Sequence, residues 1–97
     1  MLHTVNQSPF QKSTLESCLR FVRKGDVILL LEDGVFAAQA GTAMSSLVEG
    51  ALKSNKVYAL SADLKARALT DVIQGVEVTD YAGFVDLVEQ HTTHAWL

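Results

Sequence analysis

An uninterrupted apolar run from Val27 to Leu31 constrains the fold of this chain more than any other segment. The run is preceded by Asp26 and followed by Glu32-Asp33-Gly34. Five apolar residues without polar alternation are typical of a strand that is buried on both faces, as in parallel sheets covered by helices. Ligands of open α/β sheets bind where such strands end, so the two acids are candidates either for chemistry or for turning the chain.

Predicted strands and helices alternate along the rest of the chain. Strands are expected over residues 2–5, 26–31, 56–60 and 75–78, and helices over residues 14–24, 35–52, 62–69 and 81–91, with an interruption of the second helix near Gly41-Thr42. Ser13 and Glu16 have the spacing of a capping box, Gly25 is a C-cap candidate, and Ser61 and Asp80 are N-cap candidates. The alternation predicts a single domain over residues 1–97, a three-layer α/β/α fold whose mostly parallel sheet has helices on both faces.

Size and composition are those of a globular protein. The chain has 97 residues, of which 48% are hydrophobic and 20% are charged, enough for one compact core. A formal net charge of −3 gives no general electrostatic reason to bind nucleic acid or an anionic membrane. No apolar stretch approaches the roughly 20 residues that cross a bilayer, and the first residues lack the features of a secretory signal, so a cytoplasmic location is expected.

Cys18 is the one cysteine, which rules out a disulfide within the chain and fits a reducing compartment. It shares a helical face with apolar neighbours such as Leu15 and Leu19, so a buried and inert thiol is the expectation. The alternative is a nucleophile, which needs a nearby cation to favour the thiolate; Lys12 and Arg20 serve only if the fold brings them close.

Other chemical motifs are weak. Neither G-x-G-x-x-G nor G-x-x-x-x-G-K-[ST] occurs, so no nucleotide cofactor is predicted. Two histidines near the end, His91 and His94, together with His3 and Cys18, could nominally supply metal ligands, but no established ligand spacing supports them and no metal is predicted. The ending Ala95-Trp96-Leu97 is unusually apolar, and it packs either on the body of the protein or on another subunit.

Several stretches taken together resemble the DsrH/TusB family. They are MLHTVNQSPF at the start, LLLEDGV at Leu29 to Val35, KVYALSADLKARAL at Lys56 to Leu69, VTDYAGFVDLV at Val78 to Val88, and the terminal Trp96. The similarity covers essentially the whole chain in order and without large gaps. No single stretch is diagnostic, and the resemblance rests on their order and spacing.

The resemblance implies a DsrE-like fold and a place in a heterohexamer with DsrE/TusD-like and DsrF/TusC-like subunits. Such complexes pass persulfide sulfur between cysteines. In the TusB branch, sulfur moves from a TusA-like donor to a TusE-like acceptor for 2-thiolation of wobble uridine in tRNA. In the DsrH branch, it passes to a DsrC-like acceptor during sulfur oxidation. The cysteine of TLESCLRF and the stretch DYAGFVDL look closer to DsrH, so that branch is favoured.

The resemblance also limits the role of this chain. The principal sulfur-accepting cysteine of these complexes belongs to the DsrE/TusD subunit, and nothing here matches its position. Cys18 is therefore a secondary candidate carrier, in a chain that is not expected to be catalytic alone. Two other hypotheses stay open: a scaffolding or binding subunit without sulfur chemistry, and a small enzyme that uses Glu32 or Asp33. Under the family resemblance, the two acids are more simply a structural turn.

Overall fold

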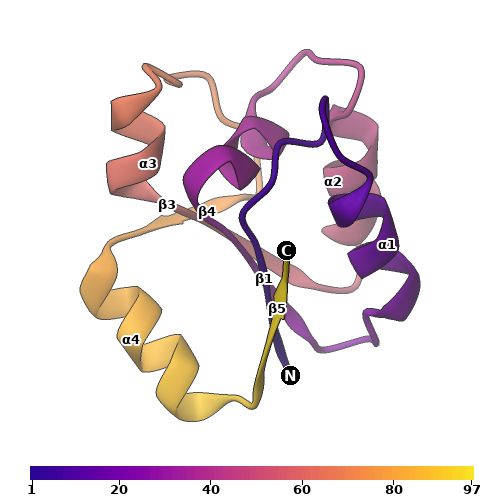
Figure 1. Cartoon of the computed structure of the whole chain (residues 1–97), viewed down its shortest axis with the longest axis vertical. Coiled ribbons are helices and arrows are strands. Elements are labelled where there is room, and N and C mark those ends of the chain that lie inside the picture. Colours follow the sequence, from indigo (N-terminus) through magenta and orange to yellow (C-terminus); the bar gives the residue numbers. More distant parts are fainter.

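A computed structural model describes all residues 1–97 as a five-stranded sheet with helices packed on it (Figure 1). In chain order, the elements are β1 (Leu2–Val5), α1 (Thr14–Phe21), β2 (Val27–Leu30), the 3₁₀ helix η1 (Glu32–Ala38), α2 (Ser45–Ala51), β3 (Lys56–Leu60), α3 (Ser61–Ala66), β4 (Glu77–Thr79), α4 (Tyr81–Gln90) and β5 (Thr93–Trp96). The strand order is β4-β3-β2-β1-β5, and every neighbouring pair is parallel. The chain thus builds the sheet from β1 out to β4 and then returns to add β5 on the other side of β1.

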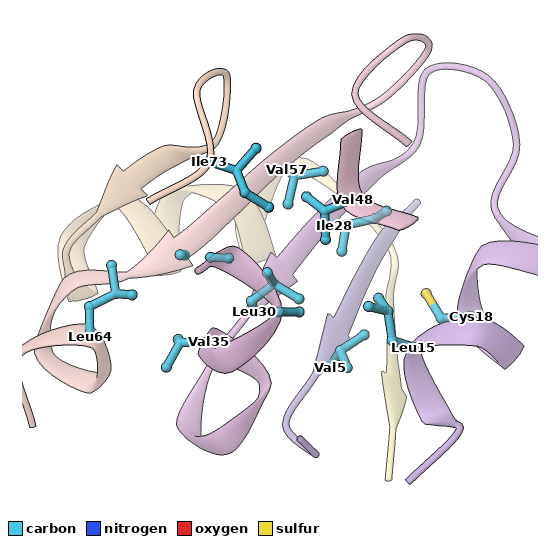
Figure 2. Packing of buried hydrophobic residues seen from close by; sticks show 13 residues of the cluster. Val5, Leu15, Cys18, Ile28, Leu30, Val35, Val48, Val57, Leu64 and Ile73 are labelled. Carbon is cyan, nitrogen blue, oxygen red and sulfur yellow. The ribbon is translucent and has the colours of Figure 1, made fainter. Parts of the chain in front are cut away.

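Alternate residues of the central strands enter two separate cores, as the two-residue period of a strand requires. Val5, Ile28 and Leu30 belong to the larger core, which also takes side chains from α1, η1, α2 and α3 (Figure 2). Leu2, Val27 and Leu29, at the alternate positions of the same strands, belong to the smaller core, to which Leu87 of α4 contributes. The predicted helices on both faces are confirmed, but the cover is uneven. Helix α4 alone covers the second face (Figure 1).

Predicted element types are confirmed for residues 2–5, 26–31, 56–60 and 81–91, with ends that shift by a residue or two. The interrupted segment 35–52 is two elements, η1 and α2, separated at the expected glycine, Gly41, whose φ is +76°. The strand predicted over 75–78 lies at Glu77–Thr79 instead. The predictions miss one strand entirely, β5.

The predicted helix caps are right in one case of four. Asp80 caps α4, since its Oδ1 accepts a hydrogen bond of 2.9 Å from the N–H of Gly83. Ser13 precedes α1 but makes no side-chain cap bond, so the capping box is not formed. Ser61 is the first residue of α3 rather than its cap, and Leu60 occupies the cap position. Helix α1 ends at Phe21, four residues before Gly25, whose φ of +90° serves the turn into β2 instead.

Candidate functional site

The acids that follow β2 are tied to the neighbouring helix α3. The Asp33 carboxylate accepts a bond of 2.9 Å from Nε of Arg67 and lies 2.8 Å from its Nη2. The N–H of Glu32, a residue with φ of 50°, donates to the Asp63 carboxylate over 2.7 Å. A Cβ at Gly34 would collide with the carbonyl oxygen of Val5, so only glycine allows this segment to lie so close to β1. Glu32-Asp33-Gly34 therefore starts η1 and locks it to the sheet and to α3, as a structural turn would.

The Cys18 thiol lies in the larger core, on the side of α1 that faces the sheet (Figure 2). The residue is fully buried, as the helical spacing predicts. Burial in these apolar surroundings, with a smaller contribution from the negative charge of Asp26, raises the pKa of the thiol to about 12. A thiol in this state is neither ionised at neutral pH nor accessible, and reactivity requires both properties. Neither Lys12 nor Arg20 is buried beside it.

A hydrogen-bonded chain that sequence analysis did not identify joins both sheet neighbours of β1. Nε2 of His3 lies 2.9 Å from Oδ2 of Asp26, and Nε1 of Trp96 lies 3.0 Å from Nδ1 of His3. His3 is almost fully buried. The indole N–H can only donate, so Nδ1 of His3 is the acceptor. The proton of a neutral imidazole is then on Nε2 and is donated to Asp26, which fixes the tautomer from geometry.

Asp26 is the anionic end of this chain. Its carboxylate accepts bonds from His3 and from the N–H of Arg23 over 3.0 Å, and its Oδ1 lies 3.2 Å from the amino group of Met1. These donors, with the His3 bond first among them, hold the pKa of Asp26 well below its usual range, against the opposing effect of partial burial. Asp26 is therefore charged at neutral pH.

The residues considered as metal ligands do not come together in one place. His94 is the sheet neighbour of His3, with ring centroids 6.4 Å apart, but His91 follows the end of α4 and Cys18 lies within the core. No cluster of three or more histidine, cysteine, aspartate or glutamate side chains is positioned to hold a metal ion.

The outer side of α4 carries an exposed apolar stripe. Tyr81, Val85 and Val88 recur at intervals of four and three residues, which places them on one side of the helix, and they are 60%, 53% and 42% exposed. Val78 of β4, immediately before the helix, is also exposed. Exposed apolar side chains that gather on one surface often mark a site of contact with another protein.

Among the helices, none is long and apolar enough to pass through a bilayer.

Comparison with known sequences gives matches along nearly the entire chain. A family model described as "DsrH like protein" matches residues 7–94. The protein TusB of Escherichia fergusonii is 42% identical over 98 residues, which cover 99% of this chain and all of that protein. TusB of Escherichia coli is 41% identical with the same coverage, and TusB of Serratia proteamaculans is 44% identical over 94% of each chain.

Solved structures show the same fold. A protein of unknown function from Methanobacterium thermoautotrophicum superposes with a TM-score of 0.73 at 14% identity, covering 97% of this chain and 96% of that one. A solution NMR structure of a Thermotoga maritima protein gives a TM-score of 0.65 at 24% identity over 94% of both chains. At these identities, the likeness concerns the fold alone.

Proposed function

Because the chain belongs to the DsrH/TusB family, we propose that it is a subunit of a cytoplasmic sulfur-relay complex that passes persulfide sulfur between cysteine-containing proteins. The observation that carries this proposal is the extent of the match, which runs over residues 7–94 in the family model and over essentially the full length of the TusB relatives. The proposed partners are DsrE/TusD-like and DsrF/TusC-like subunits. A TusA-like donor and a DsrC/TusE-like acceptor meet the complex in turn.

The sulfur step itself needs no cofactor. An acceptor thiolate attacks the outer sulfur of the donor persulfide; a new S–S bond forms, the old one breaks, and the donor leaves as a thiolate. No net oxidation or reduction occurs. The requirement is an ionised and reachable thiol, and this chain's Cys18 is neither in the fold described here. We therefore assign the transfer chiefly to cysteines of the partner subunits and keep Cys18 as a secondary carrier.

Two physiological routes fit this function. The TusB relatives support sulfur supply to 2-thiolation of the wobble uridine in tRNA. The cysteine in the first helix supports the DsrH branch and delivery to a DsrC-like acceptor, and our preference for that branch stays a prediction. Supplying the assembled complex with a TusE-like or a DsrC-like acceptor, and following which one gains a persulfide, distinguishes the two routes.

The contribution of this chain is assembly, and the stripe Tyr81–Val85–Val88 with Val78 is the surface we assign to it. The larger core face is already covered by four helical segments, whereas α4 stands alone on its face (Figure 1). The apolar side chains of the stripe are exposed. Pairing this surface with a related subunit removes that area from water, which stabilises a complex roughly in proportion to the apolar area buried.

A matched pair of charge variants tests this assignment. Val85→Glu places a carboxylate in the middle of the stripe, whereas Gln90→Glu places the same charge about 140° around the helix, on a side that is also exposed. Each variant is co-expressed with its two partner subunits, and the native mass of the purified complex is measured. We expect Val85→Glu to lose the complex and Gln90→Glu to retain it. Equal native masses for the two variants would show that the stripe is not an interface.

The competing function is a scaffold with no sulfur chemistry, and the burial of Cys18 favours it. Incubation of the complex with a persulfide donor, followed by mass spectrometry of each subunit, separates the two. A carrier chain gains about 32 Da on Cys18, the mass of one sulfur in a persulfide. A scaffold gains none while its partners do.

A further inference from the structure

A hollow of about 770 Å³ opens beside β1 and β5, on the face of the sheet that α1 covers only in part. It lies near the amino ends of β1 and β2, away from the acids that follow β2. Its volume is in the range of sites that hold small organic ligands. The relay proposed above does not use it.

The walls of the hollow are aromatic. Phe21 at the end of α1 and Trp96 at the end of β5 have ring centroids 5.6 Å apart, and the ring of His94 meets Trp96 edge-on at 4.7 Å. Phe21 is 68% exposed, an unusual position for a phenylalanine. The rings leave π-faces and edges open to an incoming planar group.

Some polar side chains that line the hollow already have hydrogen-bond partners within the chain, and others have none. The one carboxylate, Asp26, already accepts from three donors and neutralises the amino group of Met1. The side chains of Arg23 and His94 form no hydrogen bond or ion pair within the chain. Both of these unpaired side chains can donate hydrogen bonds, and the Arg23 guanidinium is permanently positively charged.

We propose that this hollow binds an aromatic or heteroaromatic ring that carries an anionic group, either a carboxylate or a phosphate. The ring stacks against Phe21 and Trp96. The anion accepts hydrogen bonds from the Arg23 guanidinium, whose forked geometry suits both anions, and from His94. His3 is a positioning residue: by accepting from the indole N–H, it fixes the plane of Trp96 against which the ring packs.

The single tryptophan makes the test direct, because the indole N–H gives one resolved signal in a ¹H–¹⁵N NMR spectrum. The full chain is titrated with phenyl phosphate and with benzoate, and separately with benzyl alcohol, benzylamine and inorganic phosphate. We expect the two aromatic anions to shift the Trp96 and His94 signals saturably. The neutral ring, the cationic ring and the anion without a ring should each bind at least about tenfold more weakly, since one charge-assisted bond is worth that much.

Two variants separate this site from nonspecific attraction. Arg23→Gln should weaken phenyl phosphate binding about tenfold, whereas Arg20→Gln removes the same charge from the last turn of α1, outside the hollow, and should change the affinity less than about twofold. Both positions are exposed, so neither substitution should disturb the core. The NMR spectrum of each variant checks that its fold is unchanged. An equal loss in both variants, equal binding of benzylamine, or no saturable shift of Trp96 would each overturn the proposal. None of these results bears on the relay function.

Discussion

At the scale of single residues, the two groups with the most perturbed chemistry are Cys18 and Asp26. Helical spacing alone predicted the burial of Cys18, because its apolar neighbours on α1 define one face. The role of Asp26 was not predictable in the same way. Its partner His3 lies 23 residues before it, and Trp96, which donates to His3, lies 70 residues after it. Only the strand order brings the three together.

The first prediction concerns access to the Cys18 thiol. Alkylation of the native chain with iodoacetamide at pH 8 should be far slower than alkylation in denaturant, because burial removes both access and the thiolate. The control is Glu16→Cys in a Cys18→Ala background, which puts a thiol on the exposed side of the same helix and should react at similar rates in both conditions. Fast native labelling of Cys18 would mean that the core opens readily there.

The second prediction concerns the stability supplied by Asp26 as a function of pH. The pKa of Asp26 is lower in the folded chain than in the unfolded one, so its stabilisation is present above the usual aspartate value near 4 and is lost as the pH falls below it. Asp26→Asn should therefore lower the free energy of unfolding by about 1 to 3 kcal/mol at pH 7, the range for hydrogen bonds to a charged group. Urea unfolding of both proteins measures this difference.

The same difference should shrink when the measurement is repeated at pH 3, where the unfolded wild-type chain takes up a proton that the folded chain resists. A gap between the two proteins that is equal at pH 3 and pH 7 would contradict the charged role of Asp26.

At the scale of elements, the sequence predicts the repeated strand-helix units and fails at the last strand. β2 and β3 are detectable because each contains an unbroken apolar run, which is fully buried in β2 and mostly buried in β3. β5 has four residues, two of which are Thr93 and His94, and its side chains are mostly exposed because it is an edge strand. β5 reaches β1 because α4 carries the chain back across the sheet. The local sequence pattern of β5 holds no information about this path.

The position of β5 decides the alternative left open for the apolar ending. Trp96 packs on the larger core and on Phe21, whereas Leu97 is 85% exposed. Trp96→Ala should therefore lower the free energy of unfolding by about 2 to 4 kcal/mol, about 1 kcal/mol less than is typical of a fully buried tryptophan, because Trp96 is only half buried. Deletion of Leu97 should change it by less than about 0.5 kcal/mol. Denaturant unfolding of the two variants checks both values, and equal costs would mean that β5 is not anchored through Trp96.

At the scale of the whole molecule, the fold class followed from the alternation of elements, but the unevenness of its two faces did not. A pattern of apolar residues cannot show that four helical segments cover one face while α4 is alone on the other, because each helix reads as amphipathic in isolation. That unevenness leaves the stripe on α4 exposed, whereas the hollow beside β5 lies on the other face, where α1 covers the sheet only in part. The proposed role in a complex depends on this surface, and the thiol of Cys18 plays the smaller part.

The claim that this chain acts by completing a relay complex, with Cys18 secondary, is tested most directly by sulfur transfer in the Cys18→Ala complex. Alanine removes the thiol without burying a new polar group, at a cost of about 1 kcal/mol for the small cavity. The variant is co-purified with its two partner subunits, its native mass is confirmed, and persulfide delivery to the acceptor is timed. We predict an intact complex that still delivers sulfur at a somewhat reduced rate. An intact complex that delivers none would make Cys18 an obligatory relay residue and contradict the account.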